Sequence, residues 1–229
     1  ALRSLGYDDD SPEVGYCHKQ LAALMIEDPD SQAVRVQPCK SPVWDTAITL
    51  RALTSAGMQS DNRAVHAAVE WLLEQQIDAP GDWSKTVEAA PGGWCFEHNN
   101  DFYPDSDDTA MVLMALAGQF SDATEPLSVL PPELRLVTDH SEDRIDDARR
   151  QVERIDRTAK AIDRGLKWIL ALQNDDGGWG AFDRNNNRQF LCHVPFADHN
   201  AMIDPSTPDL TGRVIEALGM LGIKRGDRA

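Results

Sequence analysis

The segment Gly165–Trp179, GLKWILALQNDDGGW, decides the fold class of this chain. Its first part carries apolar residues at helical spacing and ends at Gln173, and a Gly-x-Trp turn follows. The same pattern occurs earlier, in Ala68–Trp83, AVEWLLEQQIDAPGDW, where Gln76 precedes a second Gly-x-Trp. In each copy we expect the glutamine side chain to cap backbone groups of the next turn while the tryptophan closes the helix end. We therefore interpret the tryptophans of both copies as structural, namely Trp71, Trp83, Trp168 and Trp179.

A second repeat alternates with the first. A polar triplet precedes an apolar run at Asp45-Thr46-Ala47, again at Asp108-Thr109-Ala110, and more loosely at Leu210-Thr211-Gly212. Such triplets are typical of helix starts, so we predict a helix over Thr109–Leu116 and expect Asp45 and Asp209 to cap helices. Strand signals are weak throughout. The two alternating repeats predict an all-α chain built as an array of helical hairpins.

The repeats also suggest how the chain is divided. Residues 1–40 contain helical sequence over Ser11–Glu27 but lack both repeats, so we place a boundary near Ser41. The acidic, arginine-rich segment Ser121–Arg157 separates two repeat units and is interpreted as a surface insertion, partly helical or disordered. Two long irregular stretches, Gly92–Pro104 and Gly180–Pro208, are rich in aromatic residues, Asn and Asp. Loops of that length in a compact domain are usually functional.

Composition excludes several classes of protein. The formal net charge of −16 argues against nucleic-acid binding and against electrostatic docking on anionic lipid. The four cysteines are scattered, which is typical of a reduced, intracellular chain without a zinc site. No apolar run approaches the roughly 20 residues that span a bilayer. The chain begins and ends without a terminal element, so we expect it to be a fragment that is inactive alone.

The chemistry-bearing residues are the acids in Asp105-Ser106-Asp107-Asp108. In a chain this acidic such a cluster arises easily by chance, and one reading is an acidic cap on the helix that follows. The other reading is a proton donor. Three carboxyls crowded at one helix start among aromatic residues cannot all ionise cheaply, so at least one keeps its proton. Nearby aromatic faces would suit a cationic substrate.

Other uses of the acids fail on spacing. An EF-hand needs Gly at the sixth loop position, where this chain has Ala110. Asp107-Asp108 are followed by Thr, Ala and Met, so a D-D-x-x-D magnesium motif is absent too. The chain also lacks a Walker loop and a G-x-G-x-x-G fingerprint. We therefore expect no metal and no organic cofactor.

Three features together resemble the squalene–hopene cyclase family: the segment Tyr103–Ala110, the two glutamine–tryptophan repeats, and Ser41–Thr46. The resemblance covers nearly the whole chain outside the Ser121–Arg157 insertion. It implies an α/α toroid, an α6/α6 barrel in which the family's QW repeats clamp helix ends. Residues 1–40 would be the tail of a preceding α-barrel domain. Residues 41–229 would then form part of the catalytic barrel.

The resemblance also implies roles for the acids. The family's proton donor falls on Asp107, and the carboxylates that support it fall on Asp105 and Asp108. Some members carry His at the position of Arg213, where this chain has a fixed cation. Because a cation favours the ionised form of a neighbouring carboxyl, we expect Arg213 to pair with Asp105 or Asp108 while Asp107 stays protonated.

The family's aromatic cavity wall, which binds the folded substrate and stabilises ring cations, falls on Trp44, Phe96 and Phe182. At Phe182 the family often has Tyr, so a hydroxyl is lost. Trp94 and Tyr103 are either further wall residues or part of the core. The segment His193–Ala197, including Phe196, resembles the lining of a substrate entry channel that opens to the membrane.

The implied reaction is protonation-initiated (class II) polycyclisation of squalene or a similar linear polyprene to hopene- or hopanol-type triterpenes. It is an isomerase-type activity, with hydro-lyase chemistry where water terminates the reaction. The resemblance implies a monotopic protein on the cytoplasmic face of a membrane and is compatible with a homodimer. Three alternatives remain open: another acid-initiated cyclase (of oxidosqualene, a C35 polyprene or a diterpene diphosphate), a glycosidase with paired carboxylates, and a non-catalytic helical-repeat scaffold.

Overall fold

A computed structural model describes residues 6–27, 33–36, 40–58, 60, 62–98, 100–120, 142–193 and 202–224, with side chains described from residue 149 onward in the segment that begins at 142. The chain divides into two units, Ala1–Lys40 and Ser41–Ala229. Each unit is described by itself.

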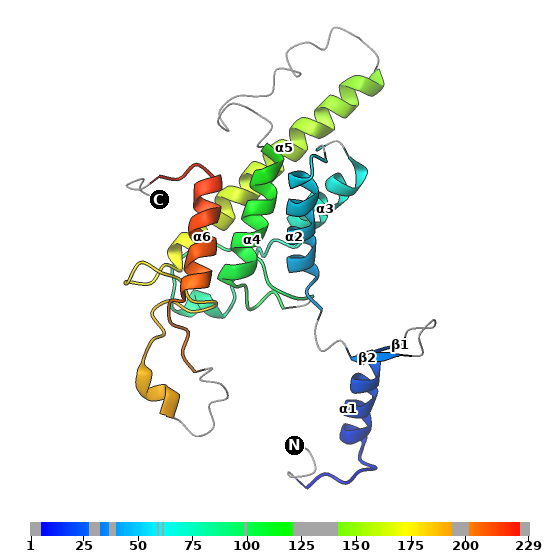
Figure 1. Cartoon of the computed structure of the whole chain (residues 1–229), viewed down its shortest axis with the longest axis vertical. Coiled ribbons are helices and arrows are strands. Elements are labelled where there is room, and N and C mark those ends of the chain that lie inside the picture. Colours follow the sequence, from blue (N-terminus) through cyan, green and yellow to red (C-terminus); the bar gives the residue numbers. More distant parts are fainter. Residues whose placement is uncertain are drawn as a thin grey trace. The chain divides into compact units, whose positions relative to one another are not determined.

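The first unit is a helix followed by a small hairpin (Figure 1). Helix α1 spans Pro12–Ala23, and the Oγ atom of its N-cap, Ser11, accepts a hydrogen bond from the Val14 N–H. Strands β1 (Met25–Glu27) and β2 (Val34–Val36) pair antiparallel. The expectation that the helix continues to Glu27 is therefore wrong. Residues Met25–Glu27 pair with Val34–Val36 as strands and do not extend the helix, because the β-branched residues of these segments favour strands.

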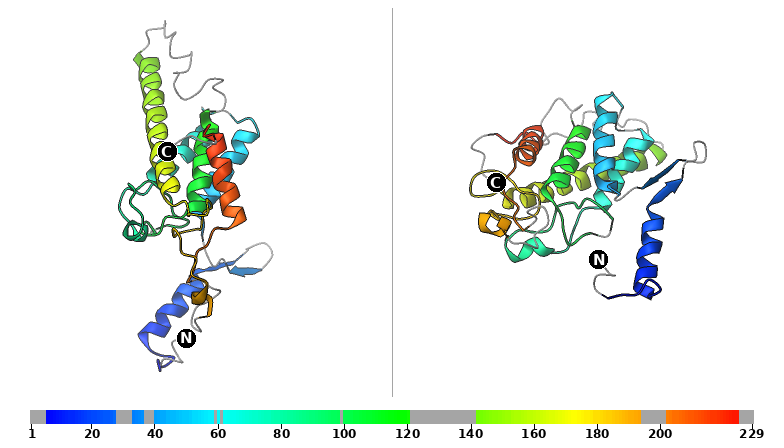
Figure 2. Two further views of the ribbon diagram at one scale, coloured as in Figure 1. Left: turned by 90° about the vertical axis from the view of Figure 1, so that its left-hand side faces the viewer. Right: turned by 60° about the horizontal axis from the view of Figure 1, so that its bottom comes forward.

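Three helices of the second unit lie side by side and run in the same direction (Figure 1; Figure 2). They are α2 (Pro42–Ser55), α4 (Ser106–Ala117) and α6 (Pro208–Met220). Helix α4 lies in the middle and packs against both others. Because the three N-termini lie at one end, side chains of their first turns can meet there.

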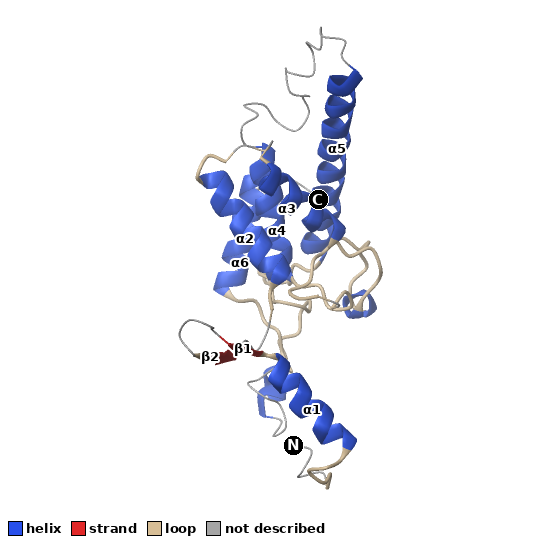
Figure 3. Cartoon of the chain, turned by 90° about the vertical axis from the view of Figure 1, so that its right-hand side faces the viewer, coloured by secondary structure: helices blue, strands red, loops and turns tan. Residues whose placement is uncertain are grey.

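Two further helices complete the unit, as Figure 3 shows. Helix α3 (Arg63–Glu74) packs on α2, and the long α5 (Glu142–Ala171) packs on α4 and runs opposite to it. Short 3₁₀ turns lie at η2 (Asp82–Lys85), η3 (Gly118–Phe120) and η5 (Gln189–His193). The regular elements assigned among the described residues of the second unit are all helices, joined by long loops, which confirms the all-α prediction for this unit.

Helix α4 is the centre of the core. Ten of its twelve residues are buried, because α2, α5 and α6 cover different sides of it. The helix starts three residues before the predicted Thr109, and Asp105 is its N-cap. Helices α2 and α6 also start ahead of their polar triplets, so Asp45 and Asp209 lie in first turns rather than at caps.

The C-terminal part of the predicted insertion is helical. Residues 121–141 lie outside the described residues, but α5 continues without a break from Glu142 through Arg157. Arg157 pairs with Glu70 of α3 at 2.7 Å, and the next residue, Thr158, is buried. The helix therefore packs on the repeat units before the predicted insertion ends.

The clasps at the helix ends are made by indole N–H groups. The Nε1 atom of Trp94 donates to the Leu72 carbonyl of α3 at 2.7 Å. Trp179 donates in the same way to Ile169 of α5, also at 2.7 Å. These carbonyls belong to last helical turns, where the regular intrahelical donors run out, although the Ile169 carbonyl also accepts from the Leu172 N–H at 3.2 Å. The structural counterpart of Trp179 is thus Trp94, not Trp83 as the sequence spacing suggested.

The glutamines of the two repeats differ in what they bind. Gln173 caps the next turn as expected, because its Nε2 donates to the Gly177 carbonyl at 2.9 Å. The Nε2 of Gln76 instead donates to the carbonyls of Gly92 and Ala161. A long segment, residues 77–91, separates Gln76 from Gly92, and the second repeat has no such segment between Gln173 and Gly177. The expectation of a local cap is therefore wrong for Gln76, which joins α5 to the loop before Trp94.

Candidate active site

The acid cluster is built into the first turn of α4. Asp105 is buried, and its Oδ1 accepts a hydrogen bond from the Asp108 N–H at 2.8 Å. Its own N–H donates to the Trp94 carbonyl at 3.0 Å, and the Trp94 N–H donates to the Thr109 hydroxyl at 3.0 Å. Both contacts come from the clasp residue that closes α3. The position of the acids is thus tied to the repeat that forms the fold.

Two of the three carboxyls favour the protonated form. Asp105 and Asp108 are 4% and 2% exposed. Burial, followed by repulsion from Asp108, raises the pKa of Asp105 well above its ordinary value. Burial raises the pKa of Asp108 to about 6, against the hydrogen-bonding contribution of Asp105, which lowers it. Both buried carboxyls therefore hold their protons to a higher pH than a free aspartate does, which is the direction that the crowding of three acids predicts.

Asp107 is the accessible member of the cluster. Its side chain is 30% exposed, and its Oδ1 contacts the Nη1 atom of Arg213 from α6. The Arg213 guanidinium also lies over the ring of Trp44, 5.0 Å from the ring centre. Asp107, Arg213 and Trp44 come from α4, α6 and α2, so the site is assembled where the three helix N-termini meet.

The expected partner of Arg213 is corrected by this geometry. We expected the guanidinium to pair with Asp105 or Asp108, but it pairs with Asp107. The physical reason is burial: Asp105 and Asp108 are almost fully buried, whereas the Asp107 side chain is 30% exposed and can meet the guanidinium. Asp107 points toward the neighbouring helix.

The predicted wall residues do not all lie at the surface. Trp94 is fully buried, and its indole N–H is used by the clasp, so it is a core residue rather than a wall residue. Phe96, Tyr103 and Phe182 are 36–48% exposed on the two long loops. Phe196 lies outside the described residues. Trp44 is thus the one predicted aromatic for which the described residues show a contact with the acid site, through Arg213.

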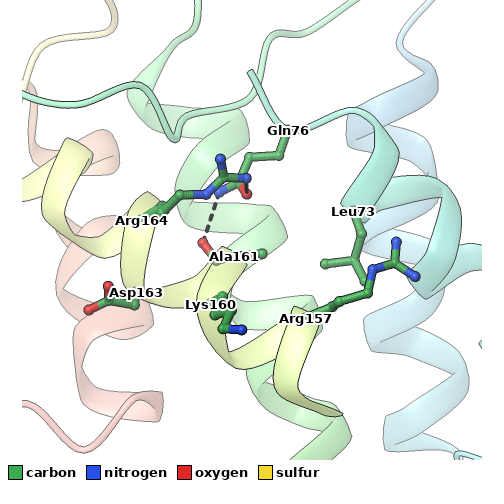
Figure 4. A pocket seen from close by; sticks show the side chains of 7 residues that line it. All are labelled: Leu73, Gln76, Arg157, Lys160, Ala161, Asp163 and Arg164. Carbon is green, nitrogen blue, oxygen red and sulfur yellow. Dashed lines mark hydrogen bonds between the residues drawn. The ribbon is translucent and has the colours of Figure 1, made fainter. Parts of the chain in front are cut away.

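A hollow of about 450 Å³ lies away from the acids, between α3 and α5 (Figure 4). Its lining includes the cations Arg157, Lys160 and Arg164. Arg157 and Lys160 are paired with carboxylates, and Arg164 donates to the Gln76 side-chain oxygen. Two of these cations are therefore compensated by carboxylates, and the third is held by an amide. We do not assign the hollow to the active site.

Two further kinds of feature are absent from the described residues. They contain no group of three or more His, Cys, Asp or Glu side chains placed to hold a metal ion. Within the same part of the chain, no helix is both long enough and apolar enough to cross a membrane.

Three residues whose hydrogen bonds hold the site and its loops were missed in the sequence. Thr109 binds the Trp94 N–H, and the equivalent Thr211 binds the Trp179 N–H at 3.1 Å. The recurring Thr of the polar triplets was the signal for this pair. Asp204 binds the loop around Phe182 and carries no such signal.

Comparison with known proteins identifies a family that this chain matches. The profile of the family described as "Squalene-hopene cyclase C-terminal domain" matches residues 40–126 and 143–229. A squalene–hopene cyclase from Zymomonas mobilis subsp. mobilis is 36% identical over 230 residues, covering 98% of this chain and 30% of the relative.

Two further relatives agree. A squalene–hopene cyclase from Bradyrhizobium diazoefficiens is 36% identical over 96% of this chain and 29% of the relative. One from Alicyclobacillus acidocaldarius is 37% identical over 80% of this chain and 24% of the relative. The chain thus spans about 30% or less of the length of these relatives.

Proposed function

The chain belongs to the squalene–hopene cyclase family, whose fold is an α/α toroid, and from this we propose that the complete gene product is a protonation-initiated triterpene cyclase. The proposed substrate is squalene, and the products are pentacyclic triterpenes of the hopene or hopanol type. The observation that carries the proposal is the acid site itself: two buried carboxyls with raised pKa values next to a third, accessible carboxyl paired with a cation.

The division of labour within the cluster follows from exposure. Asp107 is the carboxyl that a substrate can reach, so we assign it the proton transfer. Asp105, whose pKa is raised furthest, is the buried proton reservoir of the cluster, and Asp108 contributes to it below about pH 6. When Asp107 gives up its proton it becomes a carboxylate, which the Arg213 guanidinium stabilises.

The chemical step balances without a cofactor. The π electrons of a terminal double bond take the proton from Asp107, a C–H bond forms, and the neighbouring carbon becomes a tertiary cation. Successive double bonds attack in turn, so each new C–C bond passes the positive charge along the chain. The reaction ends when a carbon next to the last cation loses a proton, or when water adds to that cation.

The aromatic residues fit the charge that moves through the substrate. Each aromatic face that meets a desolvated cation contributes about 2 kcal/mol. The rings of Phe96 and Phe182 are exposed on the loops that flank α4, and Trp44 already holds one cation, Arg213. Folding the polyene against such faces lowers the barrier by holding the reacting double bonds in order.

We further propose that the protein works on a membrane surface, because squalene partitions into bilayers. Flotation of the purified protein with neutral phosphatidylcholine vesicles tests this. A protein that stays at the bottom of the gradient contradicts surface attachment.

The function is tested by offering the purified gene product squalene, oxidosqualene, a C35 polyprene and a diterpene diphosphate in parallel. We expect squalene to give pentacyclic products by mass spectrometry and Asp107→Asn to abolish them. Faster cyclisation of another substrate identifies the other acid-initiated cyclases. Unchanged activity in Asp107→Asn contradicts the assigned donor.

A further inference from the structure

One carboxylate outside the acid cluster binds a whole turn of backbone. The Oδ1 atom of Asp204 accepts a hydrogen bond from the Ala181 N–H at 2.9 Å. Its Oδ2 atom accepts from the N–H groups of Phe182 at 2.6 Å and Asp183 at 2.8 Å. Three consecutive N–H groups on one carboxylate form an anion-binding turn, and each bond to an ionised acceptor is stronger than a neutral one.

The same turn touches the acid helix. The Ser106 N–H, in the first turn of α4, donates to the Ala181 carbonyl at 2.8 Å. First-turn N–H groups have no acceptor inside their own helix, so this contact satisfies a group that the helix leaves open. Ser106 lies directly between Asp105, the N-cap, and Asp107.

The two contacts share one peptide group. The carbonyl of Ala181 and the N–H of Phe182 belong to the same peptide unit. Its oxygen accepts a hydrogen bond from the Ser106 N–H, and its N–H donates one to the Asp204 carboxylate. Hydrogen bonds in such a chain polarise and strengthen one another. The charge of Asp204 therefore strengthens the hydrogen bond between the Ala181 carbonyl and the Ser106 N–H at the start of α4.

Gly180 packs directly against Asp204. A Cβ atom at Gly180 would lie 2.5 Å from the Asp204 carbonyl oxygen and 2.8 Å from its Oδ2, so glycine is required there. The Asp204 N–H donates to the Asn186 carbonyl at 2.7 Å, which fixes the acid from its own backbone. The carboxylate is held against the turn from both sides.

We propose that Asp204 is a positioning residue of the acid site: through the Ala181–Phe182 peptide it holds the first turn of α4, and through the Phe182 N–H it fixes the backbone of a predicted cavity-wall residue. The catalytic part of this inference rests on the proposed cyclase function. The coupling between Asp204 and the start of α4 does not, because it concerns hydrogen bonds alone.

Asp204→Asn is the informative substitution. The amide is close to the carboxylate in size but has one acceptor oxygen, and its NH₂ group would face a backbone N–H. At least one of the three bonds is therefore lost. Asp176→Asn is the matched control. Asp176 also accepts two hydrogen bonds in this loop region, from the Gly178 N–H and the Ser206 hydroxyl, and neither donor belongs to α4.

The first measurement is amide hydrogen exchange in the complete gene product. We expect Asp204→Asn to speed exchange about tenfold or more at Ala181–Asp183 and also at Asp105–Asp108, since both depend on the turn. Asp176→Asn should leave exchange at Asp105–Asp108 unchanged. Unaltered exchange at Asp105–Asp108 in Asp204→Asn overturns the proposal, whatever the activity of the protein.

The second measurement separates positioning from substrate binding. With squalene, Asp204→Asn should lower kcat ten- to a hundredfold with KM within about threefold of the parent, because a small displacement of the acid affects the chemical step. Asp176→Asn should keep kcat within about twofold. Equal kcat in the two variants overturns the catalytic role. A parent protein that cyclises no squalene refutes the proposed function, and the exchange result still decides the coupling.

Discussion

Trp94→Phe tests the structural repeat that holds the acid helix in place. The indole N–H of Trp94 is the donor to the Leu72 carbonyl at the end of α3, and its carbonyl receives the Asp105 N–H. Phenylalanine keeps an aromatic ring but removes the donor. A buried carbonyl without a donor costs about 1–3 kcal/mol.

The second contribution is the space left by the smaller ring. Indole exceeds phenyl by roughly 40 Å³, which at about 24 cal/mol per Å³ costs about 1 kcal/mol. Trp83→Phe is the matched control, because Trp83 is buried and loses the same volume, yet its Nε1 has no hydrogen-bond partner in the described structure. Trp94→Phe should therefore cost about 2 kcal/mol more than Trp83→Phe.

Urea unfolding of the complete gene product, followed by circular dichroism, gives the free energy of unfolding of each variant. The free energy of unfolding should be highest for the parent, lower for Trp83→Phe and lowest for Trp94→Phe. Equal losses in the two variants, or a larger loss in Trp83→Phe, would show that Trp94 is not the clasp and that the spacing-based pairing of Trp83 with Trp179 was right after all.

Three further predictions concern the acid site and the turn that braces it. Arg213→Gln removes the cation paired with Asp107, so kcat for squalene should fall about tenfold or more. The thermal midpoint should stay within about 2 °C of the parent, because the ion pair is partly exposed. An unchanged kcat would contradict the role of Arg213 in stabilising the Asp107 carboxylate. Because burial raises the pKa of Asp108 to about 6, this carboxyl holds its proton below that pH and loses it above. The cyclisation rate should therefore fall as the pH rises past about 6. A rate that increases over this range would contradict a role for the Asp108 proton. Gly180→Ala forces a Cβ to 2.5 Å from a backbone oxygen and should lower the stability by about 2 kcal/mol in urea titration, whereas Gly219→Ala, with open space in α6, should be neutral or stabilising; similar values for both refute the close fit.

The helices could be predicted because their signals are local. Apolar periodicity and the glutamine–tryptophan repeats led directly to an all-α second unit. The pairing of the tryptophans was misjudged, because a long excursion separates Gln76 from Gly92 and spacing alone favoured Trp83. The tripeptide Gly-Gly-Trp occurs at Gly92–Trp94 and again at Gly177–Trp179, and it was the signal for the correct pairing. At Gly93 a Cβ would lie 2.8 Å from the Trp168 ring, so the glycines mark where the chain crosses a helix end.

The contents of the site were easier to predict than their contacts. The acids and Arg213 were identified from the sequence motif and the resemblance. Which acid the guanidinium meets depends on how α4 and α6 pack, and that is a tertiary property. Asp204 was missed for a related reason. Its bonds go to backbone N–H groups about twenty residues away, and backbone groups carry no sequence signature.

The central claim is that a carboxyl of this cluster protonates squalene to start cyclisation. Incubating the complete gene product with squalene in D₂O measures this directly, because an acid that exchanges with solvent would deliver deuterium. The account predicts a single deuterium per product molecule, on the ring carbon that was a terminal alkene carbon of squalene, and none in recovered squalene. Cyclised product without deuterium would contradict it.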